Sequence, residues 1–179
     1  AVAGVERWSG MNETMNLLIG LAMGLNLLAL GSSRLPTVIR AMSLQGVALG
    51  VMPLLLEEHF DWRVSLVAVA TMAGKGIVIP TLLRRAMRAA QIDREMTPFI
   101  GFVPSLLLGA SATIVSVALS EALPLRPEHA GSLLAAGAFA TVFTGLLLLT
   151  GRAKAIAQVC GYLILENGIA LLAVLATFG

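Results

Sequence analysis

The chain has 179 residues, of which 58% are hydrophobic and only 12% charged, and its net charge is +2 at pH 7. Soluble domains have about 25% charged residues, so the composition excludes an ordinary soluble domain and predicts an integral membrane protein. Most of the 12 Lys and Arg residues stand in short segments between apolar runs. This arrangement is a signal of membrane topology, and we expect contact with lipid and no binding of nucleic acid.

Six apolar segments are long enough to cross a bilayer, because its ~30 Å hydrocarbon core takes about 20 residues of helix. After a short lead-in at 1–13, a single transmembrane domain is expected over 14–179, with helices at about 14–31, 35–56, 63–84, 97–119, 129–150 and 154–178. The sequence lacks the polar and apolar alternation of a membrane barrel. The predicted fold class is all-α, a polytopic membrane bundle of about six transmembrane helices.

The basic residues predict the orientation of the bundle. Eight of them fall in or beside the first, third and fifth connections: Arg34, Arg40, Arg84, Arg85, Arg88, Arg94, Arg152 and Lys154. The opposite side has three: Arg7, Arg63 and Arg126. Because cytoplasmic connections are rich in Lys and Arg, we expect the N-terminus outside. Arg40, inside the second helix, is expected to extend its head group back to the cytoplasmic interface.

Two ionisable residues stand in the middle of predicted helices. Glu166 follows Arg152 by 14 residues, and Lys75 follows Arg63 by 12 and precedes Arg84 by nine. At 1.5 Å per residue both are near the membrane midplane. Insertion scales assign a cost of about 2.5–3.5 kcal/mol to one such residue at a helix centre. Charges at this depth are typical of ion and proton pathways, and we interpret Lys75 and Glu166 as members of one.

The residues around Lys75 predict an irregular helix. Gly74 and Gly76 flank the lysine, and Pro80 has no amide hydrogen to donate to the carbonyl of Gly76, four residues earlier. The helix is therefore expected to kink or open locally. Weaker candidates for the pathway are Gln45, Asn167, Arg40, Gln158 and Thr71. For Gln45, Asn167, Gln158, Asn26 and Ser43, interhelical hydrogen bonds are the preferred interpretation.

Two readings of the charged residues remain open. In one they relay protons or ions. In the other, Lys75 and Glu166 form a static pair that fixes helix register, because buried pairs can specify geometry with little net stabilisation.

The small residues of the helices also have two interpretations. The GxxxG pairs Gly20/Gly24 and Gly46/Gly50 favour close helix packing, either inside the bundle or against other subunits.

The sequence indicates no catalytic residues, metal site or cofactor site of its own. Its single cysteine, Cys160, lies in an apolar run, and neither His59 nor His129 has a partner at metal-ligand spacing. There is no Walker loop, dinucleotide fingerprint or nucleophile elbow.

Three stretches resemble one membrane family. They are RAKAIAQVCGYLILENGIALLAVLA with its G-Y-x-x-x-E-N-G core, AGKGIVIPTLLRRA, and SSRLPTVIRAMSLQGVALGVMPLL. They resemble hydrogenase-4 component E, which is related to the K subunit of respiratory complex I. Aligned with the K subunit, Gln45 takes the place of a glutamate and Lys75 falls near a second acid. Members of the family usually continue into a further acid-bearing segment and a last helix. This chain stops at Gly179, so it is expected to be a shorter relative or a truncated chain.

The resemblance implies a subunit in the membrane arm of a group 4 [NiFe]-hydrogenase or a related complex, in the cytoplasmic (inner) membrane of a prokaryote. Iron–sulfur clusters and a nickel–iron centre are then expected in peripheral redox subunits and not in this chain. The expected membrane partners are antiporter-like proteins and a protein like the H subunit of complex I. The alternatives are a subunit of a multisubunit cation/proton antiporter without a redox partner, a structural scaffold, or an independent transporter.

Overall fold

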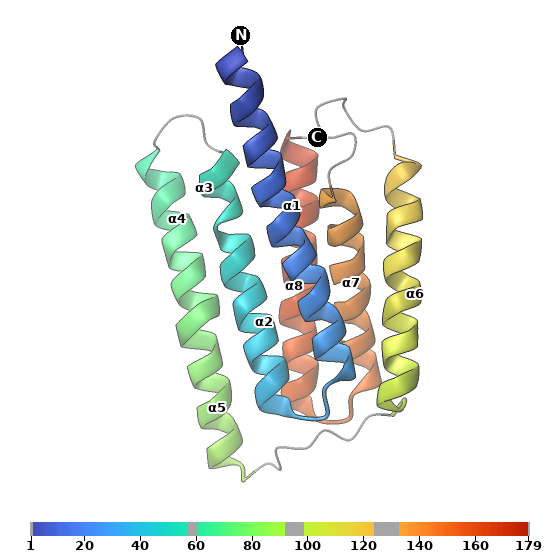
Figure 1. Cartoon of the computed structure of the whole chain (residues 1–179). Helices are drawn as coiled ribbons and strands as arrows, with labels where there is room; N and C mark the ends of the chain where they lie inside the picture. The colour runs from blue at the N-terminus through green and yellow to red at the C-terminus, as the bar shows by residue number, and fades with distance from the viewer. Residues whose placement is uncertain (1, 57–60, 92–98, 124–132, 179) are drawn as a thin grey trace.

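The computed structural model describes residues 2–56, 61–91, 99–123 and 133–178. All the regular elements in these ranges are helical (Figure 1). They are α1 (Val2–Gly31), α2 (Leu35–Gly50), α3 (Met52–Leu56), α4 (Trp62–Ala73), the π-helical turn η1 (Gly74–Val78), α5 (Ile79–Ala89), α6 (Phe102–Glu121), α7 (Leu134–Gly151) and α8 (Ala155–Phe178).

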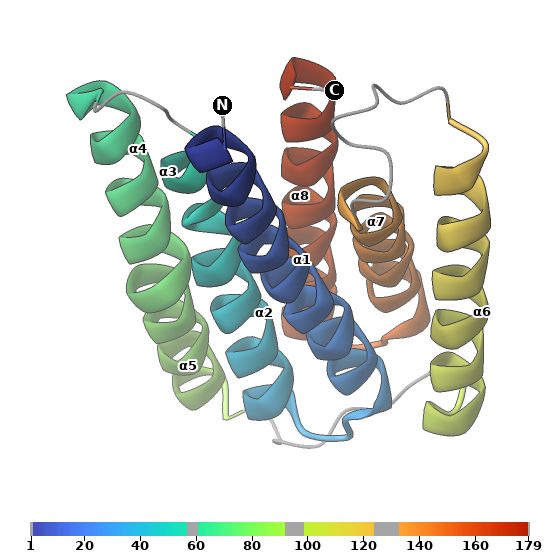
Figure 2. The same cartoon turned by 45° about the horizontal axis from the view of Figure 1, so that its top comes forward.

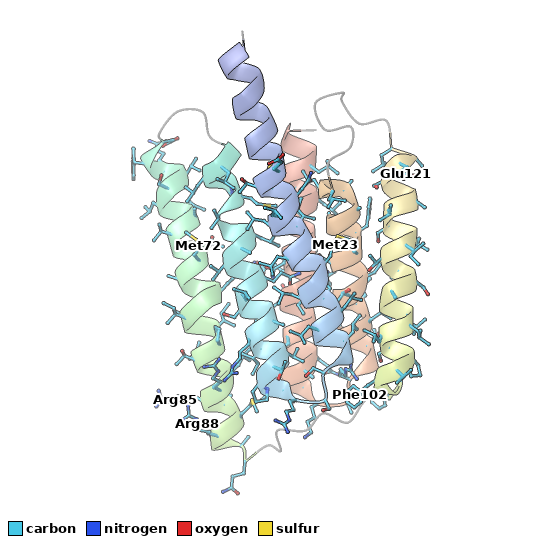
Figure 3. The ribbon with its side chains drawn as sticks, in the orientation of Figure 1. Met23, Met72, Arg85, Arg88, Phe102 and Glu121 are labelled. Carbon is cyan, nitrogen blue, oxygen red and sulfur yellow. The ribbon has the colours of Figure 1, made fainter. Side chains whose placement is uncertain are left out.

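Among the described residues, six helical segments are long and apolar enough to span a membrane. They are α1 from Glu13, α2 with α3, the continuous α4–η1–α5, α6, α7 and α8. The protein is thus a multi-pass, all-α membrane bundle, which confirms the predicted fold class. α1 begins and α8 ends at the same end of the bundle (Figure 1). Arg85 and Arg88 lie at the other end, and Glu121 lies at the first (Figure 3).

Several helices differ in their ends from the predicted spans. The first membrane span begins at Glu13, next to the predicted start at 14, and the lead-in before it belongs to the same helix, which begins at Val2. The third span continues to Ala89, since its polar end RRAMRA consists of strong helix formers. The fourth span is helical from Phe102 to Glu121. The fifth begins at Leu134. The predicted starts at 97 and 129 lie outside the described residues, as do Arg94, Arg126, His59 and His129.

α7 and α8 form a tightly packed antiparallel pair through glycines. A Cβ at Gly161 would lie 2.6 Å from the backbone nitrogen of Leu149, and one at Gly168 would lie 2.6 Å from that of Val142. α1 packs on α2 and α7, and α2 lies between α8 and the third span. The third span forms one edge of the bundle and α6 the opposite edge (Figures 1 and 2). The α7–α8 contact therefore fixes which face of α8 points toward α2.

The buried interior has two apolar clusters with polar side chains between them. One lies toward the end with the basic connections and includes Leu30, Ile39 and Leu148. The other lies toward the end with the termini and includes Ile19 and Leu171. At intermediate depth are four buried polar residues from four spans: Asn26, Gln45, Thr141 and Asn167.

Replacing Gly168 by alanine should weaken the bundle. The new methyl group would collide with the backbone of α7, and overpacking of this kind costs about 1–3 kcal/mol. We expect a lower apparent melting temperature of the purified chain in detergent, followed by circular dichroism. Gly20→Ala is the matched control, because nothing lies within 4 Å of a Cβ at Gly20. Equal melting temperatures for the two variants would contradict the close α7–α8 contact.

Arg152, which the charge count places in the fifth connection, is buried. Its side chain is 1% exposed, its Nη2 donates to the carbonyl of Leu30 at 2.5 Å, and its guanidinium lies 4.9 Å from the ring centroid of Phe102. Burial lowers the pKa of the Arg152 guanidinium, although an arginine stays protonated at neutral pH. The residue thus ties the end of α1 to the start of α6.

Substituting Arg152 should also destabilise the chain. Arg152→Ala removes a hydrogen bond from a charged donor, worth about 1.5–3 kcal/mol, and leaves a void beside Phe102. Arg152→Lys keeps a cation but loses the planar group that stacks on the ring. We therefore expect the melting temperature to be highest for the wild type, lower for the lysine variant and lowest for the alanine variant. An alanine variant as stable as the wild type would mean that the buried guanidinium contributes no stability.

Candidate functional site

The two charged residues predicted at mid-membrane depth meet each other. Nζ of Lys75, in η1, lies 3.2 Å from Oε1 of Glu166, in α8. Glu166 is halfway along its helix, 11 residues after Ala155 and 12 before Phe178. The lysine side chain is 14% exposed and the glutamate side chain 46% exposed. The sequence left open whether these side chains touch, and the structure places them in one ion pair.

Amide and hydroxyl side chains extend this ion pair into the bundle. Lys75 Nζ donates to Oδ1 of Asn167 at 2.6 Å, and Asn167 Nδ2 donates to Oε1 of Gln45 at 3.3 Å. Gln45 Nε2 donates to Oδ1 of Asn26 at 2.9 Å, and Asn26 Nδ2 donates to Oγ1 of Thr141 at 2.9 Å. We call these six residues the polar network: Glu166, Lys75, Asn167, Gln45, Asn26 and Thr141.

The helix opens at Lys75, as predicted. Gly74–Val78 forms a π-helical turn, in which the amide of Ile79 donates to the carbonyl of Gly74, five residues earlier. The carbonyl of Gly76, which Pro80 cannot satisfy, accepts a hydrogen bond from Oγ of Ser43 at 3.2 Å. Bulges of this kind often occur at functional positions. Here the bulge joins the third span to α2 beside the lysine.

Glycines of α2 make room for the third span. A Cβ at Gly46 would lie 2.9 Å from Cβ and 3.0 Å from Cδ of Lys75, so the lysine stem crosses α2 at this point. A Cβ at Gly50 would lie 2.8 Å from Cγ of Met72. The GxxxG pair of α2 thus packs inside the bundle. The pair Gly20/Gly24 of α1 does not, because nothing lies within 4 Å of a Cβ at either position.

A crevice of about 410 Å³ leads to the ion pair between α2 and α3, the third span and α8. We call it the α4–α8 crevice. Arg63 lies at one end, and Lys75 and Asn167 lie at the other. Its remaining lining is largely apolar, apart from Thr71, and includes Leu49, Met52, Val67, Ala68 and Leu171. At 1.5 Å per residue, the 12 residues from Arg63 to Lys75 span roughly 18 Å, about the depth of one leaflet.

The sequence has a curated relative over nearly all of its length. It is 34% identical over 175 residues to the uncharacterized protein Rv0085 of Mycobacterium tuberculosis (strain ATCC 25618 / H37Rv), an alignment that covers 94% of the chain and 79% of that protein. The chain belongs to the family of this mycobacterial protein. No protein-family model matches the sequence, and no solved structure matches it.

The weaker sequence candidates separate into three groups. Gln45 and Asn167 belong to the polar network. Thr71 lines the α4–α8 crevice. Gln158 lies near the basic end, where its Nε2 donates to the carbonyl of Arg152 at 3.0 Å, and Arg40 is exposed. Arg40 and Gln158 therefore belong to the basic end of the bundle and not to the network.

Sequence reasoning missed Thr141, the innermost member of the network. A threonine inside an apolar helix usually gives no signal, because its hydroxyl can bond to the carbonyl four residues earlier. Thr113 and Thr150 do so in this structure. Thr141 differs because α1 places Asn26 beside it. A hydroxyl and an amide on two different helices cannot be paired from their sequence positions alone.

The site is suited to holding or passing a proton or a small cation. It combines one carboxylate, one ammonium group and three amides in an apolar surrounding. Among the described residues no three His, Cys, Asp or Glu side chains lie close enough to hold a metal ion. Cys160 is buried in the apolar cluster near the basic end.

Proposed function

We propose that the chain is a non-catalytic membrane-arm subunit of a redox-driven proton or sodium pump of the complex I-like, hydrogenase type, in the cytoplasmic membrane of a prokaryote. The observation that carries this proposal is the Lys75–Glu166 ion pair, 3.2 Å long and halfway along its helices. Ionisable groups at this depth are costly, rare and usually functional. The resemblance to hydrogenase-4 component E supports the same role.

The polar network gives Lys75 two acceptors, and this permits two states of the site. In one state the ammonium group is shared by Glu166 and Asn167. When a proton or cation neutralises the carboxylate, the lysine keeps its hydrogen bond to Asn167, whose amide is held by Gln45. Charge on Glu166 can then change without leaving the ammonium group unsatisfied in the membrane.

The redox chemistry belongs to partners in this proposal. Iron–sulfur clusters need several cysteine thiolates, and the chain has one cysteine. Peripheral subunits would hold the clusters and the nickel–iron centre. Antiporter-like subunits and a protein like the H subunit of complex I would flank this chain in the membrane and continue its line of charged residues.

A structural scaffold is the second candidate, and a specific contact favours it. The stem of Lys75 is packed tightly against Gly46, so the ion pair also fixes the register of three helices. A multisubunit cation/proton antiporter without a redox partner is the third candidate. The Lys75–Glu166 site would act there in the same way, but an ion gradient would drive transport in place of a redox reaction.

Purification in mild detergent, with mass spectrometry of the co-purifying proteins, tests the proposed function. We expect antiporter-like membrane proteins together with iron–sulfur and nickel–iron subunits. Antiporter-like proteins without a redox subunit would replace the proposal by the antiporter alternative. The chain recovered alone would contradict both and favour an independent transporter.

A further inference from the structure

Glu166 lies on the outer surface of the bundle. Its side chain is 46% exposed, and it stands in a stripe of exposed residues on α8 that includes Val159 (43%), Tyr162 (57%) and Ile169 (54%). These residues follow one another at helical spacing. In a bilayer, the Glu166 carboxylate would therefore lie at mid-membrane depth on a surface that faces lipid or a neighbouring protein.

The polar network has one closed end and one open end. Thr141 is 0% exposed and Asn26 is 1% exposed, so the inner end is enclosed by the bundle. At the outer end, Lys75 is the single partner of Glu166 among the described residues, and it engages Oε1. The second oxygen, Oε2, accepts no hydrogen bond from them. A carboxylate oxygen in hydrocarbon without a hydrogen-bond donor is energetically costly.

We propose that the α8 stripe around Glu166, with the adjoining α4–α8 crevice, docks a transmembrane helix of a different subunit, and that this helix presents one proton-donating side chain to Oε2 of Glu166. The donor would be a lysine, a histidine or a protonated acid on an otherwise apolar helix. The inference rests on the proposed function for the existence of a multisubunit complex, and it deepens that function by locating the contact through which the polar network continues.

Lipid does not meet the requirement of this surface, because acyl chains carry no hydrogen-bond donor. The walls of the crevice are apolar, which disfavours filling by water. The third span beside the crevice is little covered by the rest of the bundle, since only 11% of its most apolar stretch is buried. An apolar helix with a single donor matches both the apolar walls and the open carboxylate.

A second copy of the chain fits less well. Around a two-fold axis at Glu166, the partner would present the same surface, so that two carboxylates would face each other. Like charges at short distance destabilise each other's charged forms. A donor from a different chain satisfies Oε2 without this repulsion.

Site-specific photo-crosslinking in native membranes tests the proposal. A photoreactive amino acid replaces Ile169, one turn from Glu166, and the adducts of the assembled complex are identified by mass spectrometry. We expect adducts with one other membrane subunit. The same residue placed at Ile114, which is 70% exposed on α6, is the control for a face at the opposite edge.

Two variants then separate docking from ion transfer. Glu166→Gln keeps one carbonyl oxygen, whose two lone pairs can be shared by Lys75 and the donor of the docked helix, and Lys75 also keeps its bond to Asn167. The Ile169 adduct should therefore retain at least half of its yield. Glu166→Leu removes the acceptor and should lower that yield at least fivefold, while the yield at Ile114 stays unchanged. The proposal would be overturned if Ile169 formed adducts with lipid or with a second copy of the chain. It would also be overturned if Glu166→Leu left the adduct yield at Ile169 unchanged. A subunit captured at Ile169 in a complex without redox or antiporter-like proteins would support docking and contradict the proposed function.

Discussion

Glu166→Gln should stop ion pumping by the assembled complex without preventing its assembly. Glutamine has nearly the same shape as glutamate and still offers a carbonyl to Lys75, but it cannot take up or release a proton. If Glu166 is a station on the ion path, we expect the pumping rate in proteoliposomes to fall at least tenfold. The activity of the redox or transport subunits of the complex is measured in parallel. The subunit composition is checked by native electrophoresis.

Glu121→Gln is the matched control. Glu121 is exposed at the end of α6 (Figure 3), at the edge of the bundle opposite the third span that carries Lys75 (Figure 1). Its substitution removes the same charge from the same chain. It should pump at the wild-type rate. A Glu166→Gln complex that also pumps at the wild-type rate would exclude the relay and favour the structural scaffold.

Hydropathy predicted the class and the number of spans because each apolar run must satisfy its backbone within one helix. It placed the ends less well. The helix that follows Lys75 runs through Arg84 and Arg85 to Ala89, because charged residues with good helix propensity extend a helix beyond the hydrocarbon. Hydropathy marks where a chain leaves lipid, and hydrogen bonding decides where the helix stops.

The charged pair was predicted as two separate positions, because an ionisable residue inside an apolar run is visible in the sequence. Their contact was not predictable. It depends on the rotation of α8, which glycines such as Gly161 and Gly168 set through contact with the α7 backbone. Arg152 illustrates the same limit. Its position between two spans carried no information on its contacts, and tertiary packing buries it against Leu30 and Phe102.

The position of the polar network follows from the packing around it. Apolar clusters separate the three buried amides from the two ends of the bundle, so that Asn26, Gln45 and Asn167 have mainly one another as partners. Each amide can then hold the next in a fixed orientation. This fixed arrangement positions Lys75 toward Glu166, and it explains why the lysine side chain crosses α2 at a glycine.

Lys75→Met should destabilise the chain, and adding Glu166→Leu should restore much of the loss. The single change leaves Glu166 without its cation and Asn167 without its donor. Breaking a buried ion pair costs about 3–5 kcal/mol, and we expect roughly 1–3 kcal/mol here because Glu166 is half-exposed in the isolated chain. At about 2–4 °C per kcal/mol for a chain of this size, the apparent melting temperature in detergent should fall measurably. The double variant removes both charges, and apolar replacements of such pairs are often neutral in stability.

The same double variant distinguishes the two roles of the pair. If Lys75 and Glu166 only fix register, a double variant that folds and assembles should also pump. If they carry charge, a double variant that assembles should fail to pump, as expected for Glu166→Gln. A double variant less stable than Lys75→Met would contradict the pairing itself, because a charge left alone must cost more than a pair removed together.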